Sequence, residues 1–187
     1  MLFRSGDTTL EKLSSLKAAF EDPAMLARFP QIHWSVSAGN ASQVSDGAAA
    51  VLVVEEQTAQ RLGYTPRAAV THFAVAGDDP VMMLTGVIPA TRKLLARAGL
   101  TLDQIDAFEV NEAFASVVLG WQRELRVAPE KVNVLGGAIA LGHPVGASGG
   151  RLLANLLRAL EQTNGRYGLQ TMCESGGMAN ATLVERL

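Results

Sequence analysis

Residues 136–150 read Gly-Gly-Ala-Ile-Ala-Leu-Gly-His-Pro-Val-Gly-Ala-Ser-Gly-Gly, a glycine-rich loop that carries one histidine, His143. The loop follows an expected strand and leads into residues 149–161, where leucines recur at helical spacing. Glycine costs conformational entropy, so a loop this rich in it indicates that the backbone closely approaches another group. The start of the following helix favours an anion or an oxyanion at the same place. A tight structural turn with an incidental histidine is the alternative interpretation.

Outward from this loop, the chain alternates between strand patterns and helix patterns. This alternation predicts an α/β fold with helices on the faces of a layered sheet. The two adjacent strand patterns near the end of the chain indicate an antiparallel pair, and therefore a mixed sheet. We expect strands at residues 48–54 (buried), 68–76, 107–110, 131–135, 167–173 and 181–186, and helices at residues 9–16, 55–62, 89–98, 113–125 and 149–161.

Composition narrows the function classes. The chain has 187 residues, of which 48% are hydrophobic and 18% are charged, and its net charge is −2. This globular composition lacks the single-sign charge that would point to nucleic acid or an anionic membrane as the partner. No apolar run approaches the roughly 20 residues of a membrane span, and the first residues lack the apolar core of a signal peptide. We therefore expect a cytoplasmic protein with no membrane partner.

Metal and disulfide chemistry are not expected within this chain. Its single cysteine, Cys173, excludes an internal disulfide and an all-cysteine metal site. No pair of metal ligands stands at helical or Cys-x-x-Cys spacing, so no metal site is predicted.

Polar residues follow three of the expected strands, and strand ends are where sites collect in layered α/β proteins. They are Asn111, His143 and Cys173. Asn111 stands at a strand-to-helix junction, so capping of the helix is its simplest interpretation. A lone cysteine is most often an inert buried side chain. Catalysis by Cys173 requires a base or charge that shifts its pKa, and His143 is the candidate.

Taken together, these elements resemble the thiolases, the acetyl-CoA acetyltransferases and 3-ketoacyl-CoA thiolases. The resemblance extends from about residue 7 to the end of the chain in order and spacing, and it is highly specific. It rests on Asn111-Glu-Ala-Phe114, on residues 136–149, on Cys173 with the glycine turn after it, on Ala38-Gly-Asn-Ala-Ser42 with residues 46–50, and on Gly86-Val-Ile-Pro-Ala-Thr-Arg92.

The resemblance implies roles for three side chains. His143 resembles the histidine that activates the nucleophile and contributes to the first oxyanion hole. Asn111 resembles the residue that holds the water completing that hole. Cys173 resembles the acid/base that moves a proton at the acetyl Cα or the CoA thiol. Claisen chemistry of thioesters develops oxyanions, and preorganised donors of this kind stabilise them.

The resemblance also implies substrate contacts. The backbone N–H near Ser175 would contribute to the second oxyanion hole, and Ser42 resembles the serine that contacts the pantetheine of CoA. Met83 and Phe114 fall where the family lines its acyl pocket. Acyl-CoA and CoA are then substrates, and no cofactor is expected.

Two residues depart from the family pattern. Ser175 replaces the first of three glycines in the turn after Cys173, and a serine would be strained there if that position needs φ > 0. Leu135 stands where many members carry asparagine, which indicates a more apolar pocket wall. The ending of the chain is similar to that of thiolases that act on bulky, steroid-derived acyl-CoAs.

The larger departure concerns length. Thiolases are about twice as long, and their first half carries the nucleophilic cysteine. The resemblance therefore predicts residues 1–44 as a largely irregular tail of the CoA-covering loop domain and residues 45–187 as the C-terminal thiolase domain. We expect this chain to be inactive alone, to pair with an N-terminal thiolase half or a chain of the same family, and to form a homo-oligomer. The alternatives are a non-catalytic thiolase-like assembly module and a CoA-ester binding protein.

Overall fold

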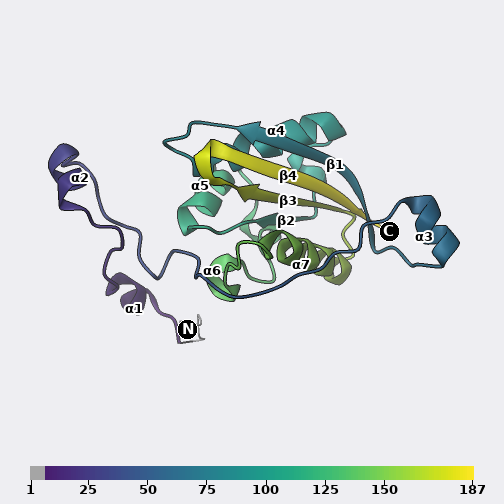
Figure 1. Cartoon of the computed structure of the whole chain (residues 1–187), viewed down its shortest axis with the longest axis horizontal. Coiled ribbons are helices and arrows are strands. Elements are labelled where there is room, and N and C mark those ends of the chain that lie inside the picture. The colour runs from purple at the N-terminus through teal and green to yellow at the C-terminus, as the bar shows by residue number, and fades with distance from the viewer. Residues whose placement is uncertain (1–6) are drawn as a thin grey trace.

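The computed structural model describes residues 7–187, and these form one sheet with helices on both of its faces (Figure 1). The strands are β1 (Ala68–Gly77), β2 (Ala107–Val110), β3 (Tyr167–Cys173) and β4 (Met178–Arg186). The helices are α1 (Leu10–Ser14), α2 (Pro23–Arg28), α3 (Glu56–Leu62), α4 (Val87–Ala98), α5 (Ala115–Leu125), α6 (Ala138–Leu141) and α7 (Ser148–Thr163). Short 3₁₀ turns lie at Leu84–Gly86, Leu102–Gln104, Pro129–Lys131 and Ser175–Gly177.

The sheet has the strand order β1-β4-β3-β2. β2 runs parallel to β3, whereas β4 is antiparallel to both β3 and β1. The parallel pair needs a long crossover, and the chain between β2 and β3 contains α5, α6 and α7. The α/β class and the mixed sheet predicted from the sequence are both confirmed.

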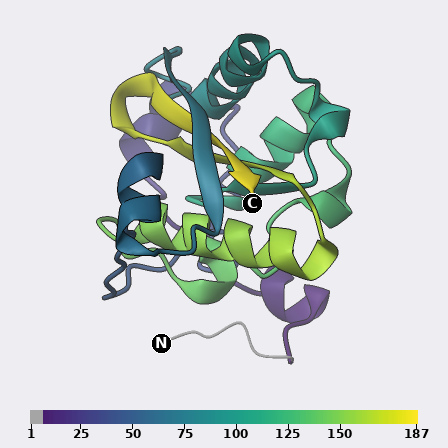
Figure 2. The same cartoon turned by 90° about the vertical axis from the view of Figure 1, so that its right-hand side faces the viewer.

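Alternate residues of the strands build two separate cores. Phe108 of β2 and Leu183 of β4 pack with α4 and α5 on one face, whereas their neighbours Ala107 and Val184 pack with α7 on the other. Figure 2 shows α4 and α7 on opposite sides of the sheet. The second core includes Leu156 and Leu160 of α7, as the leucine spacing predicts. The sheet therefore forms the middle layer between two layers of helix.

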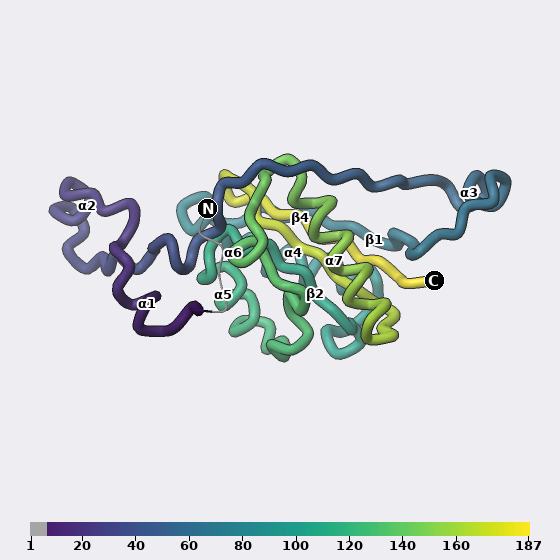
Figure 3. The backbone as a smooth tube through the Cα atoms, turned by 90° about the horizontal axis from the view of Figure 1, so that it is seen from below, coloured from purple at the N-terminus to yellow at the C-terminus, as the bar shows by residue number. Residues whose placement is uncertain are grey.

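Two expected strands are absent. Residues 48–54 form no ladder within residues 7–187 and are exposed along their length, with Leu52 74% exposed. Figure 3 shows this segment running along the molecule toward α3. The prediction of a buried strand was wrong here because, within the described residues, no strand pairs with its backbone.

The predicted strand at residues 131–135 is reduced to a single bridge between Val132 and Phe108. The ladder stops because Asn133 takes the left-handed φ of 48°. Its side-chain amide then replaces a strand backbone: Oδ1 accepts from Val110 N at 2.8 Å, and Nδ2 donates to Val110 O at 2.9 Å. The backbone N–H and C=O of Val110, at the edge of the sheet, thus bond to one side chain instead of to a fifth strand.

The segment before residue 45 lies largely outside the layered body (Figures 1 and 3). Apart from α1 and α2, it has no regular helix or strand in its described part. It joins the body where Ser42 N donates to Ala113 O at 3.0 Å and Ala115 N donates to Asn40 O at 2.8 Å. None of the helices within residues 7–187 has the length and apolarity that a membrane span requires.

A buried hydrogen bond in the α4–α5 core gives a stability test. Trp121 Nε1 donates to Thr91 Oγ1 at 2.9 Å, and both residues are fully buried. Thr91→Val leaves this N–H without a partner, so we expect the free energy of unfolding to fall by about 1–3 kcal/mol in urea titrations. Thr91 Oγ1 itself donates to Val87 O, four residues earlier, at 2.7 Å. Thr163→Val is the matched control, because Thr163 Oγ1 makes the same bond to Ala159 O at an exposed position. A loss of about 0.5 kcal/mol or less is expected for Thr163→Val, and an equal loss in both variants would contradict the assignment.

Candidate active site

Asn111 lies at the end of β2, where the parallel ladder continues for one more bond. Its N–H donates to Thr171 O of β3 at 3.0 Å, and the residue is almost fully buried. Because side chains alternate along a strand, Ala107, Glu109 and Asn111 point to the same face, which is the face covered by α7. Asn111 therefore faces the loop that leads into α7, and it is not the N-cap residue of α5, which is Phe114.

His143 follows α6 in this loop and is fixed on both sides. Its N–H donates to Gln43 O at 2.9 Å, and it forms a parallel bridge with Val44. Gly142 just before it has a φ of 96°, a value that a residue with a side chain rarely adopts, and a Cβ there would overlap Ser45 Oγ. The glycine is therefore required both by conformation and by space.

A chain of hydrogen bonds defines the protonation of the His143 ring. Ser148 Oγ, in the first turn of α7, donates to Pro144 O at 2.9 Å and lies 2.6 Å from His143 Nδ1. Since the hydroxyl proton is used on Pro144 O, the serine oxygen accepts from Nδ1–H. In the neutral ring, Nε2 then carries the free electron pair.

The other ring nitrogen faces Asn111. Asn111 Nδ2 lies 3.5 Å from His143 Nε2, so the predicted pair of site residues is in direct contact. Burial, together with the charge of Arg151, holds the pKa of His143 below its ordinary value. At neutral pH the ring is uncharged, with an electron pair beside the Asn111 amide.

Glu112 connects the end of β2 to the histidine loop, a function that the sequence analysis missed. Its carboxylate accepts from Asn133 Nδ2 at 2.8 Å and from Ile139 N at 2.9 Å. The carboxylate lies against Gly137, where a Cβ would overlap it. Glu112 and Ser148 both lie inside the quoted motifs, so a polar side chain within such a motif is the signal that could have identified them.

Cys173 ends β3, opposite Ala179 of β4, and is partly buried against the α4–α5 core. Burial raises the pKa of its thiol above the ordinary value; a backbone hydrogen bond opposes this shift, and the Glu174 carboxylate adds to it. The thiol therefore keeps its proton at neutral pH in this chain, which suits a proton donor.

The turn after Cys173 interlocks with the loop that contains Met83. Asp78 N donates to Gly177 O at 2.8 Å, and a Cβ at Gly177 would lie 2.6 Å from Asp78 O. The positive φ values of this turn, 77° and 83°, belong to Gly176 and Gly177. Ser175 is outside the left-handed region, so the strain considered for it in the sequence analysis is absent. Met83 itself has a φ of 52°.

The remaining predicted residues fall into two places. Ser42 lies beside the motif around Asn111, since its N–H bonds to Ala113 O and its neighbour Ala41 forms a bridge with Phe114. Leu135, considered as a pocket wall, packs against the α7 core. Within residues 7–187, no three His, Cys, Asp or Glu side chains gather as metal ligands.

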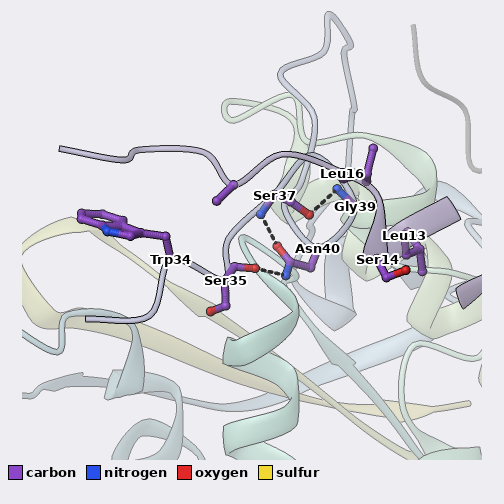
Figure 4. Close-up of a pocket in the computed structure, with 9 residues that line it drawn as sticks. Leu13, Ser14, Leu16, Trp34, Ser35, Ser37, Gly39 and Asn40 are labelled. Atoms are coloured by element: carbon purple, nitrogen blue, oxygen red, sulfur yellow. Dashed lines mark hydrogen bonds between the residues drawn. The ribbon is translucent and has the colours of Figure 1, made fainter. Parts of the chain in front are cut away.

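A separate cavity of about 380 Å³ lies between α1 and residues 34–40. Figure 4 shows its Ser37–Asn40 turn, closed by bonds between Asn40 and Ser35 and Ser37, with the Trp34 ring lying apart from that turn. The residues that line it include none of the predicted site residues.

The close approach of Glu112 to the histidine loop is testable by adding one methyl group. Gly137→Ala places a Cβ where the Glu112 carboxylate lies, so we expect a loss of about 1–3 kcal/mol in the free energy of unfolding in urea. Gly146→Ala is the control, because Gly146 is in the same loop, has no atom within 4 Å of an added Cβ and lies outside the positive-φ region. Equal stability of the two variants would show that Glu112 does not require this space.

Comparison with known families covers most of the chain. The family described as "Thiolase, C-terminal domain" matches residues 64–186, and the family described as "Thiolase, N-terminal domain" matches residues 3–57. Two curated relatives are a steroid 3-ketoacyl-CoA thiolase from Mycobacterium tuberculosis, 49% identical over 97% of this chain and 42% of its own length, and a 3-ketoacyl-CoA thiolase from Aliivibrio salmonicida, 46% identical over 96% of this chain and 45% of its own length.

Solved structures agree with the sequence relatives. The acetyl-CoA acetyltransferase of Bacillus anthracis superposes with a TM-score of 0.88 at 38% identity, over 98% of this chain and 44% of that one. Human mitochondrial 3-ketoacyl-CoA thiolase in complex with CoA superposes with a TM-score of 0.84 at 37% identity, over 97% of this chain and 43% of that one. The chain thus spans less than half the length of the relatives it matches. It belongs to the thiolase family, and the match to that family's C-terminal domain covers most of the chain.

Proposed function

We propose that this chain supplies the acid/base and oxyanion-binding half of an acyl-CoA C-acyltransferase that performs thiolysis of 3-ketoacyl-CoA or the reverse Claisen condensation. The observation that carries the proposal is the contact between Asn111 and His143, with the ring oriented by Ser148. A neutral imidazole held by its Nδ1–H is suited to take a proton from a thiol and then to donate it to a developing oxyanion.

Each predicted residue has a place in this proposal. His143 activates the nucleophilic thiol of the complete enzyme and, with a water held by Asn111, binds the thioester oxygen. Cys173 moves the proton at the acetyl Cα or the CoA sulfur, and its raised pKa agrees with a protonated thiol at rest. The N–H of Ser175 contributes the second oxyanion site, Ser42 contacts pantetheine, and Met83 and Phe114 line the acyl pocket.

The nucleophile is proposed to lie on residues outside this chain. Its single cysteine is Cys173, which ends β3, and the curated relatives are more than twice as long as the part that it matches. Acyl transfer through a covalent thioester needs a second thiol, so the chain alone should not turn over.

The α7 face of the sheet favours a partner that completes this layer. α7 covers β2 and β3, whereas β1 on the same side leaves Phe73 66% exposed. The exposed residues 51–54 lie inside the match to the N-terminal thiolase domain. Large exposed apolar areas of this kind mark interaction surfaces. We infer that an N-terminal thiolase half, supplied by the rest of the protein or by a separate chain, covers both.

The catalytic proposal predicts complementation. Thiolysis of acetoacetyl-CoA by CoA is monitored as the loss of the 3-ketoacyl-CoA absorbance. The purified chain should show no thiolysis, and adding a separately expressed N-terminal thiolase half should restore the activity. In the restored complex, His143→Ala should lower kcat by about 10²–10³-fold because an oxyanion donor is lost. His33→Ala is the matched histidine control and should keep full activity.

Three outcomes separate the alternatives. Turnover by the chain alone at ordinary enzyme rates would contradict the need for a second thiol. Tight binding of the N-terminal half without turnover would instead support a non-catalytic assembly module. A CoA-dependent rise in Tm without any partner or turnover would support a CoA-ester binding protein.

The uncovered apolar face predicts self-association of the isolated chain. Light scattering should show a mass that rises with concentration, and Phe73→Ser should reduce this rise. Leu119→Ser is the matched control, since Leu119 is 62% exposed on α5, which covers the other face of the sheet. A monodisperse monomer at all concentrations would contradict the prediction.

A further inference from the structure

A buried cluster of ionisable and polar side chains lies between the sheet and α7, and the proposed mechanism does not use it. Glu109 of β2 is 1% exposed, and both of its carboxylate oxygens are buried with no hydrogen-bond partner among residues 7–187. The same holds for all three side-chain nitrogens of Arg151 on α7, and for Oε1 of Gln170, which lies beside Glu109 in the parallel register. Buried charges are normally paired, so this arrangement requires a reason.

The cluster lies next to the proposed site on both elements. Along β2, Glu109 and Asn111 are two residues apart and point to the same face. Along α7, Arg151 follows Ser148 by three residues, which places the two side chains next to each other on the helix surface. Since Asn111 and Ser148 both contact the His143 ring, Glu109 and Arg151 form the adjacent layer beneath that ring.

Charged groups reach this region from two of the elements around His143. α7 contributes Arg151, and β2 with the residues after it contributes Glu109 and Glu112. The segment that crosses the histidine loop contacts it through Gln43 and Val44, which are uncharged. β3 ends at Cys173, whose pKa is raised by its own burial. Among these groups, the charge of Arg151 disfavours a proton on the ring.

Glu109 does not cancel that charge in the range where histidine titrates. Burial raises its pKa to about 8, an effect that Arg151 opposes and Glu112 increases. The carboxyl group therefore holds its proton below neutral pH. Burial lowers the pKa of Arg151, and the charges of Glu109 and Glu112 oppose this shift. A guanidinium nevertheless stays protonated at neutral pH.

We propose that Arg151 is a positioning residue of the active site: a buried cation, one turn along α7 from Ser148 and without a hydrogen-bond partner among residues 7–187, that keeps the His143 ring uncharged. The inference rests on the proposed function for its catalytic meaning. An imidazolium has no electron pair to accept a thiol proton, so Arg151 would keep the general base in its active form toward lower pH.

The test is a titration of the histidine ring in the folded chain. The pKa of His143 is measured by NMR from its ring signals against pH, with His33 and His72 as internal references. Arg151→Met should raise the His143 pKa by about one pH unit, the size expected for removal of a unit charge about 10 Å away at an effective dielectric constant of about 20.

Two controls make the result specific. Arg158→Met removes an exposed arginine from the same helix, one paired with Glu161, and should leave the His143 pKa unchanged. Glu109→Gln should also leave it near the wild-type value, because the carboxyl group is already protonated where His143 titrates. A marked fall in Glu109→Gln would show an ionised Glu109 that cancels Arg151, and would contradict the proposal.

The remaining outcomes are decisive as well. An unchanged His143 pKa in Arg151→Met, with a native amide spectrum, would overturn the proposal; if that variant does not fold, Arg151→Gln takes its place under the same criterion. The titration needs no turnover, so failed complementation would remove the catalytic proposal and leave this result intact. In a restored complex, Arg151→Gln should move the acid limb of the pH profile of kcat to higher pH. Substitution of a purely structural residue would not cause that shift.

Discussion

The carboxylate of Glu112 joins the two parts of the molecule on which the site depends. One part is the end of β2 with the Asn133 side chain, and the other is the loop that begins at Gly137 and carries His143. Because the carboxylate accepts a hydrogen bond from each part, it sets how closely Asn111 and His143 approach. A glycine is needed where the carboxylate meets the loop, since any Cβ at residue 137 would occupy the same space. Glu112 therefore helps to hold the two site side chains together although, within residues 7–187, its carboxylate is hydrogen-bonded to neither of them.

The layered architecture explains why the polar residues are concentrated at one end of α7. Toward its C-terminus this helix packs leucines against Ala107 and Val184, as an ordinary core requires. Toward its N-terminus the same face presents Ser148 and Arg151, opposite Asn111 and Glu109 of β2. The change from apolar to polar contacts along one strand and one helix brings a hydrogen-bonding layer, and beneath it a layer of ionisable side chains, to one end of the helix.

Much of the site could be predicted from the sequence, because its residues occur in contiguous motifs. Asn111, His143 and Cys173 were identified from their positions after strands, and the first two are in contact. The strand at residues 131–135 could not be excluded, because its apolar pattern is that of a strand and only the φ of Asn133 ends the ladder. The buried strand at residues 48–54 failed for another reason: its pattern is that of a strand, but nothing within residues 7–187 pairs with it.

The sequence by itself determined the α/β class, the thiolase family and the residues around which a site would form, because periodicity and motif order are local properties of the chain. Only the tertiary structure decided which of these residues meet. The bonds from Ser148 to His143, from Glu112 to Ile139 and from Asn133 to Val110 join residues between 5 and 27 positions apart. The position of Arg151 beside Glu109, under the histidine ring, likewise follows from packing α7 on β2. Contacts across elements depend on how strands and helices pack, and no local pattern contains that information.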